Sequence, residues 1–165
     1  MIVNWIHLLR SGHGQRSVIN MKTSIVTNTI LKIATKSDTF LHPLKLQKLL
    51  FFSCALGLVR HKKWLINGDF YAWRVGPIEH EVYYNYPGDN NITELMPGNT
   101  YIRSSEESYR VISDVMRQYG KMNAYELTAE THLPGSPWAQ VYVKGEGKID
   151  KQLIYDYYKE HERID

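Results

Sequence analysis

The segment from Pro43 to His61 constrains the fold of this chain more than any other part of the sequence. Its apolar residues fall on nearly every side of a helix: Leu44, Leu46, Leu49, Leu50, Phe52, Ala55, Leu56 and Val59. A helix without a polar face belongs at the centre of a domain. Pro43 suits its first position, where no backbone donor is needed. The sequence therefore predicts a mainly α domain built around this hydrophobic helix.

Five further helices are expected to surround the central one, which makes about six in all. They are predicted over residues 24–36, 78–86, 104–119, 123–133 and 151–162. Two starts carry the pattern of a capping box, in which Ser104 precedes Glu107 and Asn123 precedes Glu126 by three residues. Such pairs satisfy the free backbone donors at a helix start. Gly120 is expected to end the helix over 104–119.

A small β-hairpin is the one expected departure from helix. The aromatic run over residues 70–73 favours a strand. Asn67-Gly68 just before it is typical of a tight hairpin turn. Residues 87–100 are rich in Pro, Gly and Asn and predict a surface loop, and residues 135–143 are expected to be irregular or weakly extended.

The chain of 165 residues is long enough for one domain with a core of its own. We expect that domain to cover residues 21–165. The segment over residues 11–17 reads as a linker, and the periodic pattern begins only after Met21. Residues 1–20 are therefore either an additional arm or the product of an upstream start codon.

Several classes of protein are disfavoured by composition. The formal net charge of +3 comes without a dense Lys/Arg stripe, so nucleic acid is not demanded as a partner. A single cysteine, Cys54, excludes a disulfide framework within the chain. No apolar stretch reaches the roughly 20 residues of a membrane span, and the start of the chain lacks the features of a signal peptide. We expect a cytoplasmic protein without contact to a membrane.

The residues that catalysis or metal binding would need are scattered. The seven histidines do not share a predicted helix face at the spacing of a metal site, so no metal or other cofactor is expected. Glu79, His80 and Glu81 resemble a solvated helix face rather than an acid–base site, because positions two apart on a helix point to different sides. No phosphate-binding loop or nucleophile motif is present. The protein is therefore not expected to be an enzyme.

Two features point to binding instead. Lys45 and Lys48 lie in the opening turns of the central helix, where positive charge opposes the helix dipole, and Gln47 adds hydrogen-bonding capacity between them. Either acidic groups such as Glu79 or Glu81 pack nearby, or the lysines serve a partner. Trp73 and Arg74 precede the rigid turn at Gly76-Pro77, and these two residue types resemble a binding hot spot. The alternative is that Trp73 fills the core while Arg74 is solvated.

Three blocks in the right order make the chain resemble the Panacea-domain (SocA-like) antitoxin family. The first runs over residues 43–52, the second over residues 72–77 followed by Val82-Tyr83, and the third from Tyr119 to Trp138. The resemblance assigns two groups of residues. The residues expected to bind the partner are Lys45, Gln47, Lys48, Trp73 and Arg74. The motif residues expected to be structural are Leu46, Leu49, Gly76, Pro77, Tyr83, Thr131, His132, Pro137 and Trp138.

The resemblance also implies a role. Members of the family resemble bacterial or phage antitoxins that neutralise a toxin encoded by a neighbouring gene, by direct binding. SocA-like members look like adaptors that deliver the toxin to the ClpXP protease. We therefore expect a protein toxin as the partner, with a ClpXP-type protease as a second. The alternative is a DNA-binding autoregulator without catalytic activity, although no helix-turn-helix with basic recognition residues is evident.

Overall fold

The computed structural model describes residues 20–162, so residues 1–19 of the expected arm lie outside the described part. Seven helices and one hairpin build this part of the chain: α1 (Thr23–Lys36), α2 (Pro43–His61), β1 (Phe70–Trp73), β2 (Gly76–Glu79), α3 (His80–Asn85), α4 (Glu107–Tyr119), α5 (Ala124–Thr131), α6 (Pro137–Tyr142) and α7 (Lys151–His161). The predicted fold class, mainly α with a small hairpin, is confirmed.

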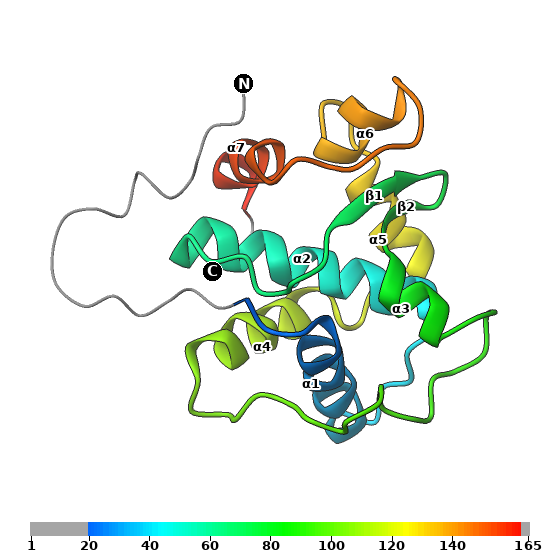
Figure 1. Ribbon diagram of the computed structural model, residues 1–165, viewed down its shortest axis with the longest axis vertical. Helices are drawn as coiled ribbons and strands as arrows, with labels where there is room; N and C mark the ends of the chain where they lie inside the picture. The colour runs from blue at the N-terminus through cyan, green and yellow to red at the C-terminus, as the bar shows by residue number, and fades with distance from the viewer. Residues whose placement is uncertain (1–19, 163–165) are drawn as a thin grey trace, which may run out of the picture.

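Helix α2 occupies the centre of the molecule, as its sequence predicts. Every residue from Lys45 to Leu58 is buried. The helix packs against α1, α3, α4, α5, α7 and β2, and Figure 1 shows α1 and α4 on one side of it with α7 on the other. Its side chains supply much of the hydrophobic core, among them Leu46 and Leu49, which are fully buried.

The hairpin differs from the prediction in the strand that pairs with residues 70–73. The strand over residues 70–73 is confirmed as β1, but it pairs with β2, which follows it, in an antiparallel register that joins Trp73 to Gly76. The turn is therefore Arg74-Val75 rather than Asn67-Gly68. The Asn67 side chain instead accepts a hydrogen bond from the Thr23 backbone N–H, 3.0 Å away, at the start of α1.

The helix predicted over 78–86 is shorter at both ends, and its later start has the same reason. Residues 78 and 79 belong to β2, so α3 begins at His80. The edge of β1 away from β2 is also covered, because Ala72 donates its N–H to the Gly147 carbonyl at 2.8 Å.

The two predicted capping boxes have opposite outcomes. The box at Asn123 is confirmed: its side-chain oxygen accepts from the Glu126 N–H at 3.0 Å, and the Glu126 carboxylate accepts from the Asn123 N–H at 2.7 Å. The box at Ser104 is wrong. Helix α4 begins at Glu107 instead, and its N-cap, Glu106, makes no side-chain cap.

The expectation of irregular chain over residues 135–143 is also wrong, because α6 lies there. Ser136 caps this short helix by accepting a hydrogen bond from the Ala139 N–H at 3.2 Å. Pro137 occupies its first turn, where a missing donor costs nothing. The same two signals, a capping serine followed by proline, are visible in the sequence.

The long connection between α3 and α4 is tied to α1 by one buried side chain. Asn28 donates to the Met96 and Thr100 carbonyls, each at 3.2 Å, and accepts from the Met96 N–H at 2.8 Å. Met96 and Ile102 are buried in the core. Part of the predicted surface loop is thus packed into the domain.

Replacing Asn28 by Ala is expected to lower the free energy of unfolding by about 2–3 kcal/mol, because a buried N–H and carbonyl would lose their partner. Urea denaturation followed by tryptophan fluorescence measures the change. Asn85→Ala is the control, since its side chain donates to the Glu81 carbonyl at an exposed position and should cost less than about 0.5 kcal/mol. Equal losses for the two variants would contradict the assigned role of Asn28.

Within residues 20–162, no helix combines the length and the apolar character that crossing a lipid bilayer would require.

Candidate partner-binding site

The predicted site residues of α2 are buried, and two of them lie beneath the hairpin. The best-connected of them is Gln47, which is 2% exposed. Its side-chain amide donates to the Glu79 carbonyl and its oxygen accepts from the Glu79 N–H, both at 2.9 Å. An amide side chain in this geometry supplies the hydrogen bonds that a third strand would make, because it satisfies one donor and one acceptor at the outer edge of β2.

Lys48 lies next to Gln47 and is fully buried. Its ammonium nitrogen reaches the Pro77 carbonyl at 3.4 Å, a long contact for a hydrogen bond. Gly76 lies directly against it, because a Cβ at Gly76 would stand 2.7 Å from the Lys48 Cε atom. Burial lowers the pKa of Lys48 to about 7, since the charged form loses its hydration.

Lys45 is bound elsewhere. Its ammonium group donates to the Gly120 carbonyl at 2.6 Å, at the end of α4. The carbonyl end of a helix carries partial negative charge and favours a cation. Burial lowers the pKa of Lys45, and the nearby Glu126 carboxylate opposes that shift. The contact thereby links the start of α2 to the end of α4.

The acidic groups considered as partners for these lysines act differently. Glu79 is buried rather than part of a solvated helix face, which corrects the reading of residues 79–81. Its carboxylate caps α3 by accepting from the Val82 N–H at 2.8 Å. Burial raises the pKa of Glu79, while this backbone hydrogen bond lowers it. Backbone carbonyls, and not Glu79 or Glu81, accept the hydrogen bonds of the two lysines.

The third sequence block packs against the hairpin from the side of α5 and α6. The Trp138 indole N–H donates to the Trp73 carbonyl at 2.7 Å. The His132 ring stacks on Trp138, with centroids 3.6 Å apart. Burial and the charge of Lys48 lower the pKa of His132. The His132 Nε2 atom is buried without a hydrogen-bond partner among the described residues.

The remaining motif residues shape this contact. Thr131 is buried, and its hydroxyl donates to the Thr128 carbonyl at 2.8 Å within α5. Pro77 is buried in β2, and Pro137 is buried at the start of α6. Their chemistry offers no reactive group. Together with Gln47, Lys48 and Trp138, they hold the hairpin backbone against the body of the domain.

The exposed predicted residues gather at the tip and side of this hairpin. Strand alternation turns Phe70 and Ala72 inward, while Trp73 is half-buried and faces outward. Arg74 is exposed on the turn, and the Tyr83 ring meets Trp73 edge-on at 4.8 Å between centroids. Trp73 and Arg74 are thus adjacent at the surface, while Lys45, Gln47 and Lys48 lie below it. That all five contact a partner remains a prediction.

Sequence reasoning missed three rings beside this pair. Tyr71 and His80 stack with centroids 4.2 Å apart, and Tyr84 is exposed on α3. The two-residue alternation of β1 could have placed Tyr71 on the same face as Trp73. The expected helix over 78–86 hid the relation of His80 to the strand.

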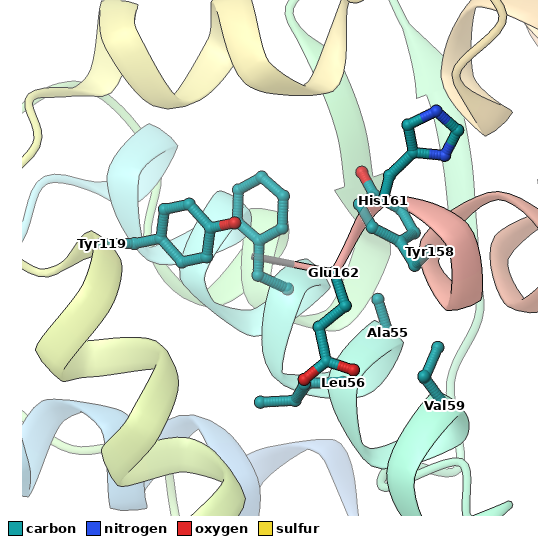
Figure 2. A pocket seen from close by; sticks show the side chains of 8 residues that line it. Ala55, Leu56, Val59, Tyr119, Tyr158, His161 and Glu162 are labelled. Carbon is teal, nitrogen blue, oxygen red and sulfur yellow. The ribbon is translucent and has the colours of Figure 1, made fainter. Parts of the chain in front are cut away.

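A separate groove runs between α2, α4 and α7 (Figure 2). It is lined by Phe52, Ala55, Leu56, Val59, Tyr119, Tyr158, His161 and Glu162. Glu162 closes one edge, where its carboxylate pairs with Arg60 at 2.7 Å. The groove uses the C-terminal half of α2, whereas the predicted site residues belong to its N-terminal half. None of the five predicted partner-binding residues lines it.

The described residues contain no group of three or more His, Cys, Asp or Glu side chains placed to hold a metal ion.

The family model described as "Antitoxin SocA-like, Panacea domain" matches residues 46–139, more than half of the chain. Antitoxin SocA of Caulobacter vibrioides (strain NA1000 / CB15N) is 32% identical over 133 residues, which cover 74% of this chain and 70% of that protein. The chain belongs to the SocA-like Panacea antitoxin family. No solved structure matches it significantly.

The SocA-like match extends from α2 to α6 and so contains the hairpin and its supports. Gln47, Lys48, Gly76 and Trp138 all fall within it. Lys45 lies one residue before its start. In this Panacea domain, the motif residues Gln47, Lys48 and Trp138 make the contacts that fix the hairpin backbone.

Proposed function

We propose that this protein is an antitoxin that neutralises a protein toxin by binding it directly. The observation that carries the proposal is the hairpin tip, where Trp73 and Arg74 lie at the surface above a backbone held by buried side chains. Trp and Arg are enriched among the residues that dominate binding energy at protein interfaces. A backbone fixed in advance loses little entropy on association. Such a binder needs no catalytic group.

The five predicted partner-binding residues then divide into two roles. Trp73 and Arg74 contact the toxin. Lys45, Gln47 and Lys48 act from below, because their polar atoms already bind carbonyls and an N–H of the domain itself. The toxin is expected to be the product of a neighbouring gene, and we place the encounter in the cytoplasm.

Growth of cells tests the proposal. The product of the adjacent gene, expressed alone, should arrest growth, and co-expression with this chain should restore colony counts. Leu49→Asp is the control, because a carboxylate at this fully buried position should unfold the antitoxin and abolish rescue. A neighbour that is harmless, or toxicity that persists beside the folded wild-type chain, would refute the proposed function.

The same assay separates two modes of neutralisation. If the chain acts by holding the toxin, rescue should persist in cells that lack ClpX. If it acts as an adaptor for a ClpXP-type protease, rescue should be lost there, and the toxin should accumulate. Copurification of the two proteins from the ClpX-deficient cells checks that binding itself is intact.

A further inference from the structure

Five rings form a continuous surface on the hairpin and α3, which we call the aromatic face. Its members are Tyr71, Trp73, His80, Tyr83 and Tyr84. The ring centroids of Trp73 and His80 are 5.5 Å apart, and those of Tyr83 and Tyr84 are also 5.5 Å apart. No ring of the face is fully buried: Tyr71, Trp73 and His80 are half-buried, and the two tyrosines of α3 are exposed.

Exposure is greatest on α3, where Tyr83 is 45% and Tyr84 74% exposed. Val75 adds a third apolar side chain at the turn and is 43% exposed. Single exposed apolar residues are ordinary, but an exposed cluster commonly marks a binding surface. Tyr and Trp are suited to one, because each presents a large apolar body and a polar tip at a low cost in side-chain entropy.

The backbone under the aromatic face is held from three directions. Gln47 binds the Glu79 backbone, Trp138 binds the Trp73 carbonyl, and the Glu79 carboxylate caps α3. The rings also pack on one another, with Trp73 edge-on to Tyr83. This face is therefore ordered before a partner arrives, which favours tight binding.

The exposed charge at the hairpin turn is positive. Arg74 is exposed next to Trp73 and forms no ion pair within residues 20–162. The other exposed charge on the hairpin and α3 is Glu81, whose field acts on the buried Glu79 carboxyl at the opposite end of β2 from the turn. An unpaired guanidinium at the rim of an apolar surface favours a carboxylate, which it can bind through two parallel hydrogen bonds.

We propose that the aromatic face binds a segment of the toxin in which an apolar side chain stands beside an Asp or Glu. The apolar side chain packs on Trp73, Tyr83 and Tyr84, and the carboxylate pairs with Arg74. This inference rests on the proposed function and adds to it the chemistry of the partner. A single-stranded nucleic acid would also stack on such rings, but its phosphates need a cationic groove, and Arg74 is the one exposed Lys or Arg of the hairpin and α3.

Isothermal titration of the purified chain with the adjacent-gene product tests the face. Tyr84→Ser and Arg74→Glu should each raise Kd at least about tenfold, as expected for interface hot spots. Tyr125→Ser and Arg103→Glu are the matched controls, because Tyr125 is 85% exposed on α5 and Arg103 is exposed in the loop before α4. Both controls should stay within about twofold of the wild type. All four positions are exposed, so the variants should fold.

A charge swap tests the carboxylate. Substituting the toxin's exposed Asp and Glu residues one at a time by Arg should yield a variant that restores binding to Arg74→Glu and binds the wild type poorly. If the wild-type proteins form no complex, both this inference and the proposed function fail. If they form a complex that Tyr84→Ser and Arg74→Glu leave unchanged, the proposed function stands and the aromatic face is refuted. Binding of single-stranded oligonucleotides that is lost in the same variants would also overturn it.

Discussion

Gly76→Ala should lower the free energy of unfolding by about 3 kcal/mol or more, for two reasons that add. Gly76 has a φ of +108°, a backbone conformation that residues with a side chain rarely adopt. A Cβ there would also stand 2.7 Å from Lys48 Cε and 3.1 Å from Thr131 Oγ1. Either the end of the buried Lys48 side chain must shift or the hairpin must lift from α2, so toxin binding should weaken along with stability.

Gly145→Ala separates the two reasons. Gly145 has nearly the same φ, +105°, but no atom lies within 4 Å of its ideal Cβ. Backbone strain alone should then cost about 1–2 kcal/mol. Urea denaturation of both variants gives the difference, which reports the contact with Lys48 and Thr131. A Gly76→Ala loss no larger than that of Gly145→Ala would mean that the hairpin accommodates the extra carbon.

The architecture could be predicted from the sequence wherever one pattern dominated locally. The segment over residues 43–61 is apolar on all sides, so only a central position suits it, and α2 occupies that position. The capping box at Asn123 was also readable, because both of its hydrogen bonds are made within four residues. Ser104 shows the same capping-box spacing. The conformation of the chain there is set instead by tertiary contacts, with Ile102 buried against α1.

The sequence singled out residues for the candidate site but did not indicate their arrangement. Lys45, Gln47 and Lys48 stood out because cations near a helix start are unusual. Their partners proved to be carbonyls and an N–H of segments at least 29 residues away in the chain, such as Pro77 and Gly120. No local pattern encodes such contacts. The outer edge of β2 is likewise completed by Gln47, which lies 32 residues before Glu79 in the chain.

Lys48→Met should stabilise the protein at pH 7 by about 1–4 kcal/mol, as found when buried charges give way to apolar groups of similar size. Met keeps the length of the side chain to Cε and removes the amine. The wild-type amine is fully buried, and its one hydrogen bond, to Pro77, is long. The charge is therefore poorly compensated in the folded chain.

The pH dependence identifies the cause. Burial lowers the pKa of Lys48 from 10.5 to about 7. Between these values the unfolded chain binds a proton that the folded chain does not, so the Lys48 contribution to stability rises with pH, by up to about 1.4 kcal/mol per unit. The advantage of Lys48→Met should therefore be largest at pH 7 and shrink towards pH 10. Urea denaturation at pH 7, 8, 9 and 10 measures it.

Lys121→Met, at an exposed position, is the matched control and should show no such trend. A second consequence concerns His132, whose pKa is lowered by burial and by the charge of Lys48. Without that charge the His132 pKa should rise, so the variant should lose less stability than the wild type below pH 6.5. Suppose instead that Lys48→Met destabilises the protein equally at every pH. In that outcome, the hydrogen bond from the amine to the Pro77 carbonyl stabilises the fold by more than the burial of the amine destabilises it. Lys48 would then be a structural cation that the hairpin requires. Its role beneath Gly76 would be to fix the position of Trp73 and Arg74 at the hairpin turn.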